Sequence, residues 1–277
     1  MSLANALCRK PITRIENSGG GVEGDDLLAV EEPLEIRVLG RSVAVVMRTP
    51  GHDRELAAGF LVTEGLLRNR DDVLDIVRCQ AVETGAETNG KGADNVMDVL
   101  LAGGVAIDWA SLTRHVFTSS SCGICSKASI DAVRAQFAAV ARPMLPRRSV
   151  LVTLPDQLRA QQAGFAASGG LHASALFDAA GTLEIVREDV GRHNALDKVI
   201  GHAFLAERLP LADRILLVSG RVSFELMQKA LAAEIPCVAA ISAPTSAAVE
   251  FARESGQVLV GFLRGERMNV YAGTLTD

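Results

Sequence analysis

The feature that most constrains the fold is a regular alternation of short apolar runs and longer amphipathic segments near the end of the chain. The runs occupy residues 215–218, 237–241 and 258–263, and the segments between them, 224–232 and 245–253, carry apolar residues at helical spacing. Strands joined by helices lie parallel, because each crossover returns the chain to the same end of the sheet. The alternation therefore predicts an α/β sheet with parallel strands.

The segment before this alternation extends the same sheet. A helix is predicted near residues 157–167, followed by strands at 172–177 and 183–187 that are joined through Gly181, and then by a helix over 190–207. Two strands joined by so short a turn pair antiparallel, so the sheet is expected to be mixed. We expect a three-layer α/β domain with helices covering the sheet.

The first half of the chain reads as a smaller α+β unit. Alternating apolar residues predict a hairpin of strands at 34–39 and 43–47, and further strands are predicted at 73–82 and 96–101. Between them a helix is predicted over residues 54–67, with Asp53 as the residue that caps its first backbone donors.

The length of 277 residues is enough for two domains. The proline-bracketed segment 142–146 is the predicted linker, which divides the chain into an α+β domain over 27–145 and an α/β domain over 146–277. Residues 1–26 combine glycine and acidic residues near their end without an apolar period, and they are expected to form a mobile tail.

Charge and hydropathy exclude several partners. The net charge is −5, which provides no overall attraction for nucleic acid or for an anionic membrane. No apolar run approaches the roughly 18 residues of a membrane span, and residues 1–11 lack the apolar core of a signal peptide. The sequence therefore predicts a cytoplasmic protein that binds neither nucleic acid nor membrane, and any anion site must be local.

Small and basic residues follow the predicted parallel strands. Ser219, Gly220 and Arg221 come after the first strand, and the segment from Phe262 to Arg267 ends the last one. Ligands of such sheets gather at the carboxyl ends of the strands, where Arg264 and Arg267 would hold a phosphate and Phe262 would stack on a ring. The alternative is a surface turn in which the two arginines pair with Glu266 and with solvent.

A polar segment opens the helix over 190–207. Here His193 follows Arg192, and the two readings are a ligand-binding histidine or a hydrogen-bonded structural one, while Asp189 is a candidate cap. A zinc deaminase needs a glutamate directly beside its first metal ligand and a Pro-Cys-x-x-Cys at the next helix start. The chain has neither, so no metal site is predicted.

The cysteine pair Cys122 and Cys125 is the sharpest local signal. It lies in a Ser-rich loop before an alanine-rich helix predicted over residues 126–140, where the helix dipole and Lys127 favour the reactive thiolate. A single C-x-x-C is also compatible with thioredoxin-like redox chemistry or with half of a zinc site. Cys79 and Cys237 lie in apolar strand patterns and are expected to be core residues.

Five segments in order resemble the formate dehydrogenase accessory sulfurtransferases, the FdhD family, over residues 34–271. They are Ser121-Cys122-Gly123-Ile124-Cys125, Gly169-Gly170-Leu171-His172-Ala173, residues 188–198 from Glu188 to Lys198, Ser219-Gly220-Arg221, and residues 261–271 from Gly261 to Tyr271. The resemblance implies a cytidine deaminase-like C-terminal domain and a homodimer.

The resemblance also implies a function. A protein of this family takes persulfide sulfur from a cysteine desulfurase and passes it to the molybdenum bis(molybdopterin guanine dinucleotide) cofactor before that cofactor enters formate dehydrogenase. By motif position Cys122 would carry the persulfide and Cys125 would assist. The expected cofactor-binding residues are Phe262, Leu263, Arg264, Gly265, Glu266, Arg267, Ser219, Gly220, Arg221 and His193.

Two other functions stay open on the sequence alone. A C-x-x-C thiol-disulfide oxidoreductase would need both cysteines equally, because they would form its disulfide. A nucleotide-cofactor-binding chaperone would need the arginines but neither cysteine. The cysteines and the arginines therefore separate the three readings.

Overall fold

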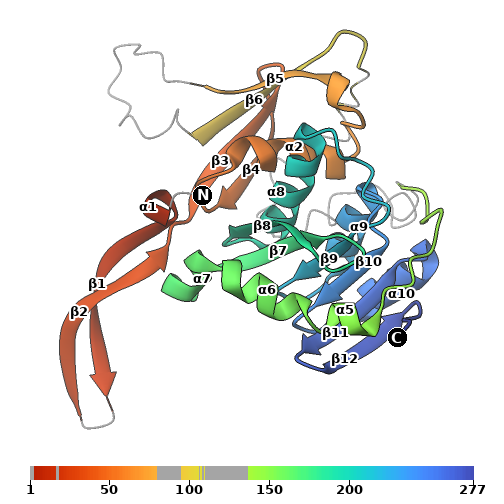
Figure 1. Cartoon of the computed structure of the whole chain (residues 1–277). Helices are drawn as coiled ribbons and strands as arrows, with labels where there is room; N and C mark the ends of the chain where they lie inside the picture. Colours follow the sequence, from red (N-terminus) through yellow and green to blue (C-terminus); the bar gives the residue numbers. More distant parts are fainter. Residues whose placement is uncertain (1–2, 17–18, 80–94, 106, 108, 110–136) are drawn as a thin grey trace.

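The protein is a mixed α/β molecule with two sheets and a separate two-stranded ribbon (Figure 1). The structure, a computed structural model, describes residues 3–16, 19–79, 95–105, 107, 109 and 137–277. Cys122 and Cys125 lie outside the described residues, as does the predicted helix apart from residues 137–140, which are not helical.

The larger sheet has six strands in the order β12-β11-β10-β9-β7-β8. Its strands are β7 (His172–Phe177), β8 (Leu183–Asp189), β9 (Ile215–Val218), β10 (Cys237–Ala240), β11 (Val258–Arg264) and β12 (Arg267–Ala272). As predicted, β9, β10 and β11 are parallel and β7 pairs antiparallel with β8, so the sheet is mixed. All residues of β9 and β10 are buried, because helices cover both faces of these strands.

Helices form a layer on each side of this sheet (Figure 1). One layer contains α5 (Arg148–Leu151), α6 (Leu154–Gln161) and α7 (Ala163–Ser168), and the other contains α8 (Arg192–Leu205), α9 (Phe224–Ala232) and α10 (Ser246–Ser255). Two separate apolar clusters fill the interfaces, since Leu154 and Leu158 pack with one set of strand residues while α8 to α10 belong to the other cluster. The domain therefore has the expected three layers.

The smaller sheet has the strand order β4-β3-β6-β5. It consists of β3 (Glu32–Val38), β4 (Arg41–Arg48), β5 (Val73–Arg78) and β6 (Val96–Leu101), with η1 (Arg70–Asp72) before β5. The helix α2 (Asp53–Thr63) lies between this sheet and α8, and Figure 1 shows α2 and α8 side by side. Residues from both halves of the chain share one apolar cluster, which joins the two predicted domains through α2 and α8.

Buried charges link α8 and α9 to α2 and to the turn before it. Lys229 on α9 donates to both carboxylate oxygens of Asp197 on α8, at 2.9 and 3.0 Å, and to Thr63 of α2 at 2.9 Å. Lys198 pairs with Asp189 at 2.6 Å and donates to the backbone oxygen of Thr49 at 2.9 Å. Each buried ammonium therefore has a carboxylate partner and an additional acceptor, as burial of charge requires.

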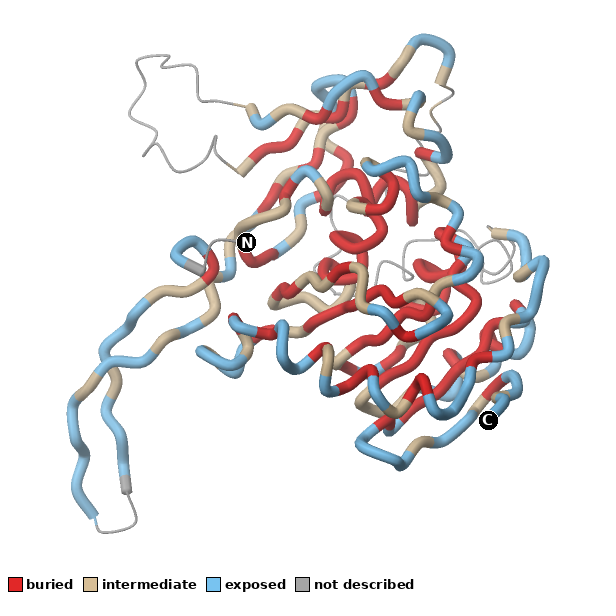
Figure 2. Tube along the Cα trace, viewed as in Figure 1, coloured by how far each residue is buried: buried red, intermediate tan, exposed pale blue. Residues whose placement is uncertain are grey.

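The N-terminus differs from the expected tail without regular structure. After α1 (Leu3–Ala6), strands β1 (Leu7–Glu16) and β2 (Gly20–Ala29) pair antiparallel as a ribbon that extends away from both sheets (Figure 1). Figure 2 shows it exposed along most of its length. The glycine-rich sequence of β2 has low strand propensity, so β2 depends on its backbone hydrogen bonds with β1. The pattern of apolar residues does not predict this pairing. Its mobility stays a prediction.

Two local predictions were wrong. Asp53 does not cap α2; its carboxylate accepts from Arg48 at 3.1 and 3.2 Å and from Arg78 at 2.6 Å, and His52 occupies the cap position in the left-handed region. The single helix expected near 157–167 is two short helices, α6 and α7, separated at Gln162. In both places a tertiary contact or a backbone break overrides the local pattern.

Candidate functional site

The carboxyl ends of β8, β9, β10 and β11 meet at one edge of the larger sheet. β8 shares the direction of β9, because both are antiparallel to β7, and β9 to β11 are parallel. The first residue of β7, His172, lies at this same edge, where Asp189 is its register partner. All the segments that the sequence singled out after the strands therefore lie along one edge.

Contacts of the backbone and of two side chains tie these strand ends together. Val222 bridges to Pro244, and the Ser219 hydroxyl oxygen accepts from the backbone of Ala173 at 2.9 Å. The Arg264 guanidinium donates through Nε to the backbone oxygen of Ile241 at 3.1 Å. Segments from β7, β9, β10 and β11 thus form a connected surface.

Phe262 has an unusual backbone at this edge. Its φ of 52° places a bulky residue in the left-handed region, and its N–H donates to the Ser242 oxygen at 3.0 Å. A side chain at Gly261 would meet Pro244 at 2.8 Å, so the strand approaches the β10–α10 loop closely there. A left-handed non-glycine residue costs of order 1 kcal/mol. Phe262 is also 40% exposed, although it is a large apolar residue.

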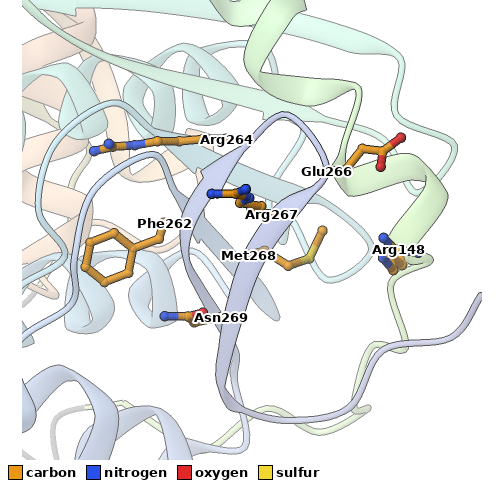
Figure 3. A pocket seen from close by; sticks show the side chains of 7 residues that line it. All are labelled: Arg148, Phe262, Arg264, Glu266, Arg267, Met268 and Asn269. Atoms are coloured by element: carbon orange, nitrogen blue, oxygen red, sulfur yellow. The ribbon is translucent and has the colours of Figure 1, made fainter.

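The first cavity, which we call the β11 cavity, opens beside this ring. It has a volume of about 810 Å³, and its lining includes Phe262, Arg264, Arg267 and Arg148. Figure 3 shows Phe262 and Arg264 extending to the same side of the strand pair. Residues 264–267 form an exposed turn between β11 and β12, as the surface-turn alternative expects. Among the described residues no ion pair joins Glu266 to Arg264 or Arg267.

The second cavity lies between α6 and the strand ends, and we call it the α6 cavity. Its volume is about 560 Å³. Asp156 and Arg159 of α6 line one side, residues 169–172 line another, and Ser219, Ile241 and Leu263 contribute from the ends of β9, β10 and β11. Arg264 lines both cavities, so the two are neighbours along the edge.

His193 lies deeper, at the start of α8. Its Nε2 is 3.3 Å from the Ser223 hydroxyl and 3.4 Å from a Glu225 carboxylate oxygen. Burial, with the positive charges of Lys229 and Arg192, lowers the pKa of His193 to about 3. Burial also raises the pKa of Glu225. His193 is therefore a neutral hydrogen-bonding group at neutral pH.

Positive charges lie close to His193 and to His172. Burial lowers the pKa of His172, and the nearby Arg192 and Arg221 lower it further. The Arg192 Nε is buried, and no hydrogen-bond partner for it occurs within the described part of the chain. A side chain at Gly220 would approach the His172 ring at 3.2 Å. The cluster is positive and accessible to a ligand anion through the exposed Arg221.

Asp189 has a structural position beneath the cluster. One of its carboxylate oxygens accepts from the Gly191 backbone at 2.8 Å and from Asn194 at 3.0 Å, and the other pairs with Lys198. It fixes the turn between β8 and α8 rather than capping the helix by the usual bond to the second or third helical N–H.

The structure thus gathers the predicted cofactor-binding residues at one edge, with His193 below it. The sequence missed Asp156, Arg159 and Phe165, because only tertiary packing brings α6 and α7 over the strand ends. Within the described ranges no group of three or more metal-ligating side chains comes together, and none of the helices there is long and apolar enough to cross a bilayer.

The fold and the site define a class of three-layer α/β protein with a cationic, aromatic-bearing surface at the carboxyl edge of its sheet. The chain belongs to the FdhD/NarQ family, whose model matches residues 29–275. This confirms the family that the sequence motifs resemble.

Relatives match along nearly the whole chain. A sulfur carrier protein FdhD from Streptomyces avermitilis is 52% identical over 268 residues, covering 96% of this chain and 93% of that protein. Another from Mycobacterium tuberculosis is 54% identical over 248 residues, with coverages of 89% and 90%. A third, from Sulfolobus acidocaldarius, is 41% identical over 253 residues, with coverages of 91% and 92%.

A solved structure supports the fold. The crystal structure of a protein assigned as a formate dehydrogenase accessory protein from Desulfotalea psychrophila superposes with a TM-score of 0.73. The sequences are 22% identical, and the match covers 97% of each chain. The mixed α/β architecture is therefore shared.

Proposed function

We propose that the protein is a sulfur carrier that supplies formate dehydrogenase. It receives persulfide sulfur from a cysteine desulfurase at Cys122 and delivers it to the molybdenum bis(molybdopterin guanine dinucleotide) cofactor held at the strand edge. The relatives named sulfur carrier protein FdhD support the sulfur-carrying role. The observation that carries the proposal is the convergence of the family's segments from four strand ends on one cationic edge.

The edge suits a guanine dinucleotide as cargo. Such a molecule carries phosphates and flat rings, which guanidinium forks and an exposed aromatic face bind. Arg264 and Arg267 are available for phosphate, since in the part of the chain that the structure describes neither forms an ion pair with Glu266. The strained Phe262 lies beside them in the lining of the β11 cavity. Leu263 and Gly265 complete this segment; Gly265 has a φ of 53°, which a turn between β11 and β12 requires.

A second group of residues would act on the same cargo. Ser219, Gly220 and Arg221 lie where β9 ends, and Gly220 keeps the space beside His172 open. His193 would contribute a hydrogen bond without charge, because its imidazole is neutral at neutral pH. Arg221 would supply charge at the rim.

The sulfur step needs only one thiolate. The Cys122 thiolate attacks the terminal sulfur of the donor's persulfide, the donor cysteine leaves as a thiolate, and a persulfide forms on Cys122. On delivery the sulfur–sulfur bond breaks, its electron pair stays on Cys122 as a thiolate, and the reduced metal centre supplies the pair for the new metal–sulfur bond. Cys125 would orient the sulfur or resolve it.

Peptide mapping by mass spectrometry tests the sulfur step. After incubation with a cysteine desulfurase and cysteine, the peptide containing Cys122 is expected to gain one sulfur atom. Cys122→Ala is expected to abolish this gain and the maturation of formate dehydrogenase, whereas Cys79→Ala, the matched control, leaves both intact. Maturation that survives Cys122→Ala would instead support the chaperone alternative.

Nucleotide binding tests the cofactor edge separately. The double variant Arg264→Ala/Arg267→Ala is expected to lose GDP affinity by roughly 10- to 100-fold, as each lost charge-assisted contact implies, while Cys122 still forms its persulfide. The exposed Arg142→Ala is the control.

A reversible Cys122–Cys125 disulfide, with activity that depends equally on both cysteines, would favour the oxidoreductase instead. The homodimer and the cytidine deaminase-like fold of the C-terminal domain are also part of the proposal, and sedimentation tests the homodimer.

A further inference from the structure

Glu225, in the first turn of α9, is a buried carboxyl group that the proposed function does not use. Its side chain is 14% exposed, and its Oε2 lies 3.4 Å from Nε2 of His193. We propose that Glu225 is a positioning residue: it carries a proton at neutral pH, donates it to Nε2 of His193, and thereby places the ring N–H of His193 on Nδ1. Only the use of that N–H by the cofactor rests on the proposed function.

Two oxygens approach the same ring nitrogen of His193. The Ser223 hydroxyl lies 3.3 Å from Nε2, and the Glu225 oxygen lies 3.4 Å from it. Because Ser223 Oγ accepts from the Leu226 backbone, its own proton is left to donate. A neutral imidazole, as His193 is at neutral pH, has one N–H and one acceptor nitrogen, and the partner of one nitrogen decides which is which. Two donors at Nε2 make it the acceptor and leave the proton on Nδ1.

Glu225 lacks the hydrogen bond that a carboxylate at its position normally has. Lys229 lies four residues further along α9, which is the spacing at which a glutamate and a lysine usually pair. An ammonium has three N–H donors, and Lys229 uses them on the two oxygens of Asp197 and on Thr63. Within the described residues, Oε2 of Glu225 is buried and has no hydrogen-bond partner. A buried oxygen without a donor favours the protonated carboxyl, which can itself donate.

The charges around Glu225 also favour its protonated form. The titratable groups that face it are Asp197, Arg192 and His193 of α8, Lys229 of α9, and Glu64 at the end of α2. Asp197 already neutralises Lys229, so a charge on Glu225 would be a further negative charge in this cluster. Burial, with the negative charges of Asp197 and Glu64, raises the pKa of Glu225 against the effect of the two cations. The positive end of α9 favours the ionised carboxyl, but Ser223 already accepts from the backbone of that first turn.

An N–H on Nδ1 gives His193 a defined role toward a ligand. In the part of the chain that the structure describes, the polar contacts of its ring are all at Nε2, so Nδ1 is left for a ligand atom. The phosphates and ring carbonyls of the proposed cargo present acceptor oxygens, which an N–H matches and a bare ring nitrogen does not. Glu225 thus makes His193 a donor, and it does so without adding a charge.

Nitrogen NMR of the full chain, labelled with ¹⁵N-histidine, tests the tautomer at pH 7. His193 is expected to show a pyrrole-type shift at Nδ1 and a pyridine-type shift at Nε2, and His193→Asn assigns its signals. Glu225→Ala removes the donor, so the Nε2–H tautomer is expected to appear, with its N–H donating to the Ser223 oxygen. Glu225→Gln, whose amide still donates, is expected to keep the proton on Nδ1. Glu31→Gln, at an exposed glutamate before β3, is the matched control.

Infrared spectroscopy tests the proton on Glu225 itself. A carboxylic-acid C=O band is expected in the wild type at pH 7 and is expected to be absent in Glu225→Gln. This variant keeps the size and the hydrogen bond of the side chain, so the measurement stands even where Glu225→Ala fails to fold. The circular dichroism spectra of both variants check their folding.

Calorimetry with GDP tests the role toward the ligand. Glu225→Ala is expected to lose GDP affinity by about 5-fold or more, as the loss of one neutral hydrogen bond implies. Glu225→Gln is expected to bind GDP as the wild type does, because it keeps His193 a donor. A purely structural carboxylate would not predict that the affinity and the tautomer change together and are rescued together.

The outcomes separate this inference from the proposed function. A ring proton on Nε2 in the wild type, or the absence of the carboxylic-acid band, overturns the proposal. A changed tautomer in Glu225→Ala with unchanged GDP affinity overturns the positioning role and leaves the proposed function standing. A wild type that does not bind GDP overturns the proposed cofactor edge, while the NMR measurement, which needs no ligand, still decides where the His193 proton lies.

Discussion

Gly59 of α2 and Gly201 of α8 face each other at backbone contact. A Cβ built on Gly59 would lie 1.8 Å from the carbonyl oxygen of Asp197, and one on Gly201 would lie 1.8 Å from that of Glu55. The neighbours are main-chain atoms, which cannot rotate away as a flexible side chain would. The crossing of the two helices therefore requires glycine on both.

Alanine at either position is expected to destabilise the fold by about 3 kcal/mol or more, because overpacking would force the helices apart. Urea denaturation at equilibrium measures the change. Gly103→Ala, where no atom lies within 4 Å of the added Cβ, is the matched control and is expected to stay near the wild type. Equal stability of Gly59→Ala and Gly103→Ala would show that the crossing is looser than the structure has it.

The buried pair of Asp197 and Lys229 is expected to behave as a unit. Asp197→Leu leaves an ammonium without its counter-charge and should cost about 3–5 kcal/mol. Lys229→Met is expected to cost a similar amount, whereas the double variant should recover much of the loss, since neither charge is then stranded. A double-mutant cycle from urea unfolding checks this, and strictly additive losses would contradict it.

Glu55 is expected to make the unfolding free energy fall at acidic pH. Hydrogen bonds from Arg187 at 2.5 and 2.7 Å oppose the effect of burial and hold the pKa of Glu55 below its usual range. Its contribution is present above the unfolded-state pKa of about 4.3 and is lost as the pH falls below it. Glu55→Gln should therefore be less stable by about 1–2 kcal/mol at pH 7 after solvent screening. The gap should shrink towards pH 3.

His193 is also expected to make the protein less stable as the pH falls, because its buried imidazole is neutral in the fold. Its pKa of about 3 in the fold lies below the value near 6.5 of an unfolded chain. The stability that depends on neutral His193 is complete above pH 6.5 and declines as the pH falls towards 3. The NMR signals of the His193 ring should not titrate between pH 8 and pH 5. A midpoint near pH 6.5 would refute the buried, neutral state.

Phe262→Gly should separate binding from stability. Glycine relieves the left-handed strain but adds unfolded-chain entropy, so the net change in unfolding free energy is expected to stay within about 1 kcal/mol. The loss of the stacking face should lower GDP affinity about 10-fold or more. Calorimetry measures the affinity and urea unfolding the stability. Unchanged GDP binding would remove Phe262 from the site.

Much of the larger sheet could be predicted from sequence. Strand β9 and helix α9 begin and end where the pattern predicts, because a fully apolar run and an amphipathic segment leave few alternatives. Strand β12 was missed: it lies at the sheet edge and only Ala272 of its residues is buried, so it lacks an apolar signal. The β1–β2 ribbon was missed for the same reason. Its strands are mostly exposed, and they are held by backbone hydrogen bonds to each other.

The site was predictable only in part. Parallel topology alone brings Ser219 and Arg264 to one edge, which sequence order is enough to infer. Asp156 lies near that edge only because α6 packs over the strands. The sequence of α6 contains no motif that predicts this position. The neutral state of His193 likewise depends on burial and on Lys229, which lies 36 residues along the chain.

The Lys198 contact has a consequence for how the molecule melts. Its ammonium, held by Asp189 in the larger sheet, also bonds the Thr49 oxygen in the turn that leads to α2. If the smaller sheet separated first, Lys198 would lose its bond to Thr49 and the shared apolar cluster would be exposed while the larger sheet was still folded. We expect calorimetric heating to give one cooperative endotherm for both sheets. The carboxyl edge of the larger sheet would then unfold together with the N-terminal half and not separately.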